Sequence, residues 1–394
     1  MNRLVLVGNG FDLAHGMPTR YNDFLLGYLK RAFNSSGQGS LYQDRLMMVT
    51  SHDFQSQVSG LFEGLNTTDD LIEHCYKNGF LNALMNNKGI QIGSITIKPL
   101  IQVYIRSDFF RILLSKCNVN NWVEIENEYY LQLKRILKLG NKGNVPKELE
   151  ELNTSMHGII EALKVYLSEL DCVGKNMDFT KIFEGDIVLD EMPLLKQEFS
   201  ILPKETLILN FNYTSTVERY ISDLKNVELV KVKINNIHGT LNDIGNPMIF
   251  GFGDEIDEDY QLLEKAKTKG FFKYIKSFWY FRTENYHNLI RFIESEEFQV
   301  VVLGHSCGLS DRTMLNLIFE HKNCKGIKIY YYANEQGDNF NELTEEISRH
   351  FSNKAALRAK VLPKPLCVPM PQINVKQLEG ANIELEAADE IEPS

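Results

Sequence analysis

The sequence predicts an α/β protein with a Rossmann-like parallel sheet and a large helical insertion. Three apolar runs rich in Val, Ile and Leu, at residues 3–7, 206–210 and 298–303, are typical of buried parallel strands. A polar or glycine-containing loop follows each run, and a helical pattern follows each loop. Strands and helices that alternate in this way favour a doubly wound sheet.

The first strand leads directly into Gly8-Asn9-Gly10-Phe11-Asp12. Glycines at the end of a buried strand let the backbone turn tightly and approach a ligand closely. The helix expected next would offer free N–H groups and its positive dipole end to a phosphate. However, Leu13 stands where the complete dinucleotide motif has a third glycine, so a plain strand–helix turn is the alternative.

Residues 41–200 show a different pattern, with apolar residues spaced three and four apart. We expect this region to be helical, with one short strand at 90–97 and helices at 71–85, 104–115, 122–139 and 152–170. Glu124, Glu126 and Glu128 stand near the start of the third helix. Paired acids can act in acid–base catalysis, but acids in a first turn also stabilise the helix dipole, and the second interpretation is favoured.

The α/β pattern returns after residue 200. We expect strands at 206–210, 227–234, 248–250, 298–303 and 326–332, and helices at 21–32, 215–223, 258–295, 311–320 and 339–351. The predicted α/β unit therefore comprises residues 1–40 and 201–360, and the helical insertion comprises 41–200. Residues 361–394 are rich in proline and then acidic, so we expect a tail that docks near 365–375 and is loose beyond.

Composition excludes several classes of function. The net charge of −10 repels the nucleic-acid backbone, so direct nucleic-acid binding is not expected. No run approaches the roughly 20 apolar residues of a membrane span, and the first residues enter a strand without a signal-peptide pattern. The six cysteines are scattered and form no Cys-x-x-Cys pair, which indicates free thiols rather than disulfides or a metal site. We expect a cytoplasmic protein.

Four of the predicted strands end in polar or glycine-rich loops, at residues 8–10, 210–212, 236–239 and 304–306. Ligands of open α/β sheets bind in the crevice outside the carboxyl ends of the strands. If the strands are parallel, all four loops meet at that edge. The sequence therefore predicts that these distant loops surround one dinucleotide.

Several side chains of these loops are candidates for chemistry. His238 can accept a proton near neutral pH, although a histidine at a strand end is often only structural. Asn212 can hold a ribose hydroxyl or a water, or it can cap the helix that follows. Asp12 can cap the first helix or contact a cationic ligand, and Ser306 can bind a phosphate. Asp311 is interpreted as an acid that stabilises a helix dipole, and His15 and His305 as structural residues.

The opening segment, residues 3–24, resembles the AbiH family of bacterial phage abortive-infection proteins. The resemblance extends to Asn121–Glu126, Leu209–Thr214, Ile237–Gly239 and Gly304–Ser306. More distantly, the same motifs resemble the sirtuin-like NAD-binding fold. Gly8, Gly10, Gly16 and Pro18 have the spacing of the sirtuin glycine-rich motif, and Asn212, His238-Gly239 and Phe252-Gly253-Asp254 are similar to later sirtuin motifs.

The resemblance implies that NAD is the substrate or ligand, that no metal is needed, and that Asn212 and His238 are catalytic. The residues implied to bind NAD are Gly8, Asn9, Gly10, Phe11, Asp12, Pro18, Arg20, Tyr21, Gly239, Gly304, His305 and Ser306. Thr214 replaces a sirtuin acid, Tyr21 a sirtuin arginine, and no cysteine-rich zinc module follows His238.

These departures imply an NAD+ glycohydrolase of phage defence rather than a protein deacylase. A quiescent hydrolase of this kind implies a phage-derived trigger and either a homo-oligomer or a partner defence protein. The alternative is a non-enzymatic nucleotide sensor that signals through the helical insertion.

Overall fold

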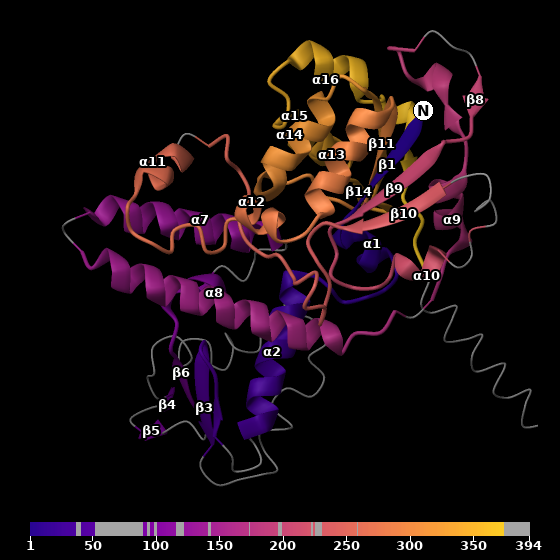
Figure 1. The fold of residues 1–394 in the computed structure, drawn as a ribbon. Coiled ribbons are helices and arrows are strands. Elements are labelled where there is room, and N and C mark those ends of the chain that lie inside the picture. Colours follow the sequence, from indigo (N-terminus) through magenta and orange to yellow (C-terminus); the bar gives the residue numbers. More distant parts are fainter. Residues whose placement is uncertain are drawn as a thin grey trace, which may run out of the picture.

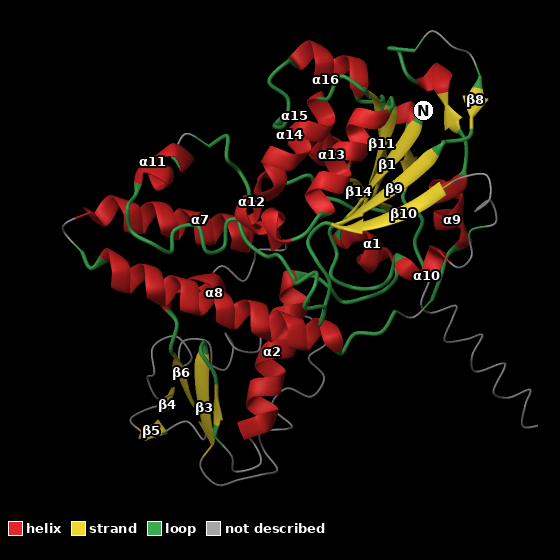
Figure 2. Ribbon diagram, viewed as in Figure 1, coloured by secondary structure: helices red, strands yellow, loops and turns green. Residues whose placement is uncertain are grey.

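A six-stranded sheet, with every neighbouring pair of strands parallel, forms the centre of the α/β part (Figures 1 and 2). Its order is β10-β9-β1-β11-β12-β15; numbered along the chain this is 3-2-1-4-5-6, the order of doubly wound dinucleotide-binding folds. The predicted α/β class and parallel sheet are confirmed. The strands are β1 (Asn2–Val7), β9 (Glu205–Asn210), β10 (Lys231–Asn236), β11 (Phe298–Leu303), β12 (Cys324–Tyr331) and β15 (Val368–Pro369). The computed structural model describes residues 1–36, 41–51, 90–92, 95–97, 101–115, 122–140, 143–172, 174–195, 199–221, 224, 231–257 and 259–373.

Different helices cover the two faces of the sheet, because successive side chains of a strand point to opposite sides. Leu4 and Leu6 of β1 pack in one core with α13, α14 and α15, whereas Val5 and Val7 pack in another with α1, α9 and α10. Both faces of β1 and β11 are buried, which explains their continuous apolar runs. The helices are α1 (Asn9–Ala14), α9 (Met177–Glu184), α10 (Glu218–Ile221), α13 (Asn285–Ser295), α14 (Arg312–Glu320), α15 (Phe340–Ser348) and α16 (Lys354–Lys360).

A third core joins the long helices α7 and α8, which run side by side, to α2 (Figure 1). Helix α8 begins where the side chain of Asn144 accepts a hydrogen bond from the amide of Lys147, with a proline in its first turn. Phe250 and Phe271, from the segment between β10 and α12, also pack in this core. The helices are α2 (Tyr21–Ser36), α6 (Asp108–Ser115), α7 (Trp122–Leu139), α8 (Val145–Ser168), α11 (Tyr260–Lys265) and α12 (Lys276–Trp279).

The inserted region contains more strand than the sequence predicts. Strands β2, β3 and β6 form an antiparallel sheet beside α2, and β4 and β5 pair with each other in antiparallel orientation. These strands are β2 (Tyr42–Gln43), β3 (Met47–Ser51), β4 (Ile90–Ile92), β5 (Ile95–Ile97) and β6 (Ile101–Ile105). The helix predicted at 104–115 begins only at Asp108, and the helix predicted at 71–85 lies outside the described residues. Short apolar runs fit either a strand or a helix, and here cross-strand pairing decides.

Three further predictions need correction. The helix predicted at 258–295 is broken into α11, α12 and α13, and Gly270, with a φ of 112°, is one interruption. The helix predicted at 215–223 begins only at Glu218, and residues 222–223 lie outside the described residues. The run at 248–250 is not a strand, because its backbone pairs with loops: the amide of Ile249 donates to the carbonyl of His238.

The carboxyl-terminal segment docks on the sheet, as the sequence predicts for residues near 365–375. Strand β15 pairs with β12, and the amide of Ile373 donates to the carbonyl of Ala14. The remaining short elements are β7 (Ile187–Val188), η3 (Leu189–Glu191), β8 (Ser200–Ile201), η4 (Tyr280–Arg282), η5 (Leu309–Asp311), β13 (Ala333–Asn334), β14 (Gly337–Asp338) and η6 (Lys364–Leu366). Among the helices described, none is long and apolar enough to span a lipid bilayer.

Candidate functional site

A cleft of about 270 Å³ lies at the carboxyl ends of β1 and β11, where the strand order of the sheet reverses. This reversal is the switch point at which doubly wound sheets bind their ligands. The structure brings nine predicted residues together along this cleft, from all four loops that the sequence singled out. They are Gly8, Asn9, Gly10, Asp12, Asn212, His238, Gly304, His305 and Ser306. What they do to a ligand stays a prediction.

The other five predicted contacts lie elsewhere. The side chains of Phe11 and Tyr21 are buried in hydrophobic cores. Pro18 accepts a hydrogen bond from the hydroxyl of Tyr166, and Arg20 is exposed. Gly239 has a φ of 79°, and a Cβ there would lie 2.2 Å from the carbonyl oxygen of Pro247. A turn of the backbone therefore accounts for this glycine without a ligand.

Gly8, Gly10 and Gly304 allow the loops after β1 and β11 to touch. A Cβ on Gly8 would lie 2.6 Å from the Cα of His305, and one on Gly10 would lie 2.8 Å from the carbonyl oxygen of Gly304. The amide of Gly10 donates to the carbonyl of Gly304, and the amide of Phe11 donates to the carbonyl of Gly8. Amides that the sequence predicted to be free for a phosphate are thus occupied. The structure explains these glycines by close backbone packing.

Asn212 and Thr214 tie the loop after β9 to the glycine loop. The side-chain amide of Asn212 donates to the carbonyl of Gly8 at 3.0 Å, and the hydroxyl of Thr214 donates to Asp12 Oδ2 at 2.6 Å. Asn212 caps no helix, since α10 begins only at Glu218. Its Oδ1 makes no hydrogen bond with another described residue. This oxygen is therefore available to a ligand in the cleft.

Asp12 is a buried acid in the wall of the cleft, and its side chain does not cap α1. Within the described part of the chain its Oδ1 has no hydrogen-bond partner. Burial raises the pKa of Asp12 to about 6, although the hydrogen bond from Thr214 opposes the shift. The carboxyl group therefore titrates close to neutral pH.

His238 is held by a buried carboxylate. Its Nε2 lies 3.1 Å from Asp311 Oδ1 and 3.3 Å from the hydroxyl of Tyr280. Its Nδ1 has no hydrogen-bond partner among the described residues. A base whose ring is oriented by an acid is the arrangement used to activate nucleophiles. The interpretation of Asp311 as a helix-dipole acid is thus incomplete: its side chain caps no helix and instead contacts His238.

Sequence reasoning missed Lys276 and undervalued Glu126. The Nζ of Lys276 lies 3.0 Å from Glu126 Oε2 and 2.9 Å from Asp311 Oδ1, and all three side chains line the cleft. Lys276 is 2% exposed and Glu126 is 4% exposed. Glu126 sits one turn before the buried Tyr129 and Tyr130, so a charged residue on an apolar helix face was the available signal. Lys276 stands in the aromatic run 271–281, which also contains Lys273, so the sequence does not single it out.

These buried charges shift one another's pKa values. Burial raises the pKa of Glu126, and the attraction of Lys276 opposes this. For Asp311 burial also acts to raise the pKa, but the positive charge of Lys276 prevails and lowers it. Burial lowers the pKa of His305 to about 4, against the attraction of Asp311, so His305 is neutral at neutral pH. The described residues contain no group of three or more His, Cys, Asp or Glu side chains suited to a metal ion.

The fold and the cleft define an α/β protein with a cleft at the switch point of its parallel sheet, bordered by a histidine–aspartate pair. The chain belongs to the AbiH family: the model of this family, described as bacteriophage abortive infection AbiH, matches residues 4–333. This confirms the family resemblance of the motifs and assigns the protein to anti-phage defence. A comparison with curated proteins gives no significant match.

Proposed function

We propose that this protein is an NAD+ glycohydrolase that cleaves the nicotinamide–ribose bond in the cytoplasm when phage infection activates it. One observation carries the proposal. Four loops that are far apart in the chain line one cleft at the switch point of a parallel sheet, and His238 lies in it beside Asp311. Dinucleotides bind at this place in doubly wound folds.

The residues of the cleft suit a hydrolysis that needs positioning more than strong nucleophiles. The oxygen of a water attacks the ribose carbon, the carbon–nitrogen bond breaks, and its electron pair leaves with nicotinamide. His238 Nδ1 would accept the proton of this water, while Asp311 holds the ring. The side-chain nitrogen of Asn212 donates to the carbonyl of Gly8, which fixes the orientation of the side chain. Its Oδ1 would then accept a hydrogen bond from a ribose hydroxyl or from the water.

The test is the release of nicotinamide from NAD by the purified full-length protein, with and without lysate of phage-infected cells. We expect release with the lysate, and a loss of about 10²–10⁴-fold in His238→Ala, the usual contribution of a general base. His287→Ala removes an exposed histidine of α13 and serves as the matched control. Absence of release in the activated wild type, or equal release by His238→Ala, would rule out the proposal.

A specific observation favours a second candidate, a nucleotide sensor without catalysis. Glu126 belongs to α7 of the inserted region, yet it lines the cleft and reaches Lys276. A ligand in the cleft would therefore act directly on α7, which would signal to another copy of the chain or to a separate defence protein. Binding of NAD in calorimetry, without nicotinamide release under activating conditions, would select this candidate.

A further inference from the structure

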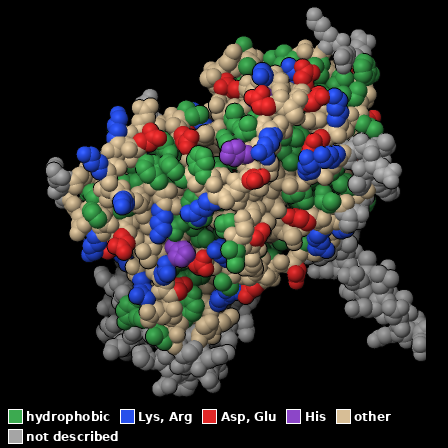
Figure 3. Space-filling model, in the orientation of Figure 1, with side chains coloured by type: hydrophobic (Ala, Val, Ile, Leu, Met, Phe, Trp, Pro, Cys, Tyr) green, Lys and Arg blue, Asp and Glu red, His purple; other side chains and the backbone are tan. Residues whose placement is uncertain are grey.

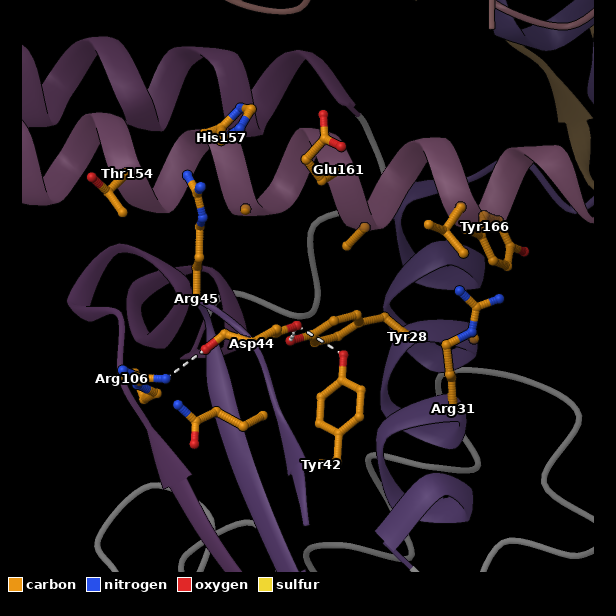
Figure 4. A pocket seen from close by; sticks show the side chains of 15 residues that line it. Tyr28, Arg31, Tyr42, Asp44, Arg45, Arg106, Thr154, His157, Glu161 and Tyr166 are labelled. Atoms are coloured by element: carbon orange, nitrogen blue, oxygen red, sulfur yellow. Dashed lines mark hydrogen bonds between the residues drawn. The ribbon is translucent and has the colours of Figure 1, made fainter. Parts of the chain in front are cut away.

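A second and larger cavity lies on the other side of α8. It has a volume of about 730 Å³ and is lined by α2, by the turn between β2 and β3, and by α8 (Figure 4). Pockets that bind small molecules have volumes of about 300–1,000 Å³. This cavity therefore has room for a ligand, and none of the predicted site residues lines it.

Three arginines belong to the polar lining of this cavity, and one of them, Arg106, donates a hydrogen bond to the backbone carbonyl of Asp44. Arg31, Arg45 and Arg106 approach it from three directions, and Arg45 extends from the turn toward α8 (Figure 4). Arg45 makes no hydrogen bond or ion pair with any residue that the structure describes. On the surrounding surface, over α8, basic and acidic side chains are interspersed (Figure 3). In a chain of net charge −10, the cavity lining carries three arginines against two carboxylates, and Arg31 is paired with Glu169 outside the lining.

The two carboxylates of the cavity already have partners. Asp44 accepts four hydrogen bonds, from the hydroxyls of Tyr28 and Tyr42 and from the amides of Leu46 and Met47. Glu161 pairs with Lys164, and its carboxylate points away from Asp44 (Figure 4). Neither acid is therefore needed to neutralise Arg45. The bonds to Asp44 also fix the rings of the two tyrosines in the cavity wall.

We propose that this cavity is a second ligand site, which binds a nucleoside phosphate through Arg45 and Arg106. One guanidinium group can donate two parallel hydrogen bonds to two oxygens of a phosphate, which makes arginine better suited to this contact than other side chains. The partly buried ring of Tyr42, fixed by its hydrogen bond to Asp44, provides a flat apolar surface for a base, whereas the ring of Tyr28 is buried behind it in the core. His157, at the top of the cavity, has its pKa lowered by burial and then by Arg45, so it is neutral and can donate a hydrogen bond.

Helix α8 links this site to the cleft. Its residues Leu163 and Leu167 line the cleft, whereas Ala162 and Tyr166 line the second cavity. The hydroxyl of Tyr166 also donates to the carbonyl of Pro18, next to the cleft residue Thr19. A ligand that moves α8 would therefore change the cleft, which gives the protein a place to receive a signal. The binding site itself does not depend on the glycohydrolase proposal.

The test is calorimetric titration of the full-length protein with ADP, and with adenosine as the probe without phosphate. We expect ADP to bind and adenosine not to bind measurably. Arg45→Glu should weaken ADP binding by about tenfold or more, since it replaces a charge-assisted contact with repulsion. Arg358→Glu, which reverses the charge of an exposed arginine on α16, is the matched control. His238→Ala, which alters the cleft, tests whether ADP binds there instead.

The variants separate the two sites. ADP binding that survives in His238→Ala and Arg358→Glu but falls in Arg45→Glu supports the second site. ADP binding that falls only in His238→Ala would place the nucleotide in the cleft and overturn the proposal. Equal binding by wild type and Arg45→Glu, or no binding of ADP to the wild type at millimolar concentration, would also overturn it.

Discussion

The two walls of the cleft are built in opposite ways. One wall consists of the glycine loops after β1 and β11, which are uncharged and touch through their backbones. The other consists of Glu126, Lys276, Asp311 and His238, whose side chains come from separate elements and are joined by buried charged contacts. The first wall is therefore sensitive to any added atom, whereas the second is sensitive to the loss of a charge.

The largest effect is expected at the charged wall. Lys276→Met removes the cation between two buried carboxylates and should lower the free energy of unfolding by about 3–5 kcal/mol. Unfolding in urea, monitored by circular dichroism, measures this loss. Lys204→Met, which breaks a surface ion pair with Glu296, should change it far less. Glu126→Gln added to Lys276→Met should recover part of the loss, and equal stability of the two lysine variants would contradict the buried network.

The glycine wall should show the next largest effect. Gly304 has a φ of 71°, and a Cβ there would lie 2.3 Å from the amide nitrogen of Phe11. Gly304→Ala therefore combines backbone strain with a clash, and we expect a loss of about 2–4 kcal/mol in urea unfolding. Gly140→Ala has the backbone strain alone, since Gly140 has a φ of 48° and no heavy atom of a described residue would lie within 4 Å of the Cβ. If both variants lose the same stability, the loops do not need to touch.

Asp12 lies beside the glycine wall, and its carboxyl group makes the stability of this side of the cleft depend on pH. Its folded pKa of about 6 lies above the unfolded value, so the folded state holds a proton that the unfolded chain releases first. Stability should therefore fall as the pH rises between these two pKa values. Relative to Asp12→Asn, the wild type should lose about 2–3 kcal/mol between about pH 4 and pH 7. If the free energies of unfolding of the wild type and Asp12→Asn changed with pH in the same way, burial would not shift the pKa of Asp12, and the prediction would be wrong.

The sequence predicted one wall well and the other poorly. Gly8, Gly10 and Gly304 were found because glycine beside a buried strand is a local signal. The structure gives these glycines a different role from the predicted one. They let the two loops touch, and few backbone amides there remain free to bind a phosphate. Lys276 gave no signal, because nothing near it in the chain shows that Glu126, 150 residues away, is its partner.

By itself, the sequence determined the parallel sheet, the loops at its carboxyl edge and the family. These follow from local patterns: apolar runs make buried strands, and parallel strands bring their carboxyl ends to one edge. Only the tertiary structure decided that α7 and α12 deliver Glu126 and Lys276 to that edge. It also decided that α2, α8 and the β2–β3 turn enclose a cavity with Arg45. The physical reason is that a buried charge is stabilised by its partners in space, which the order of residues along a chain does not record.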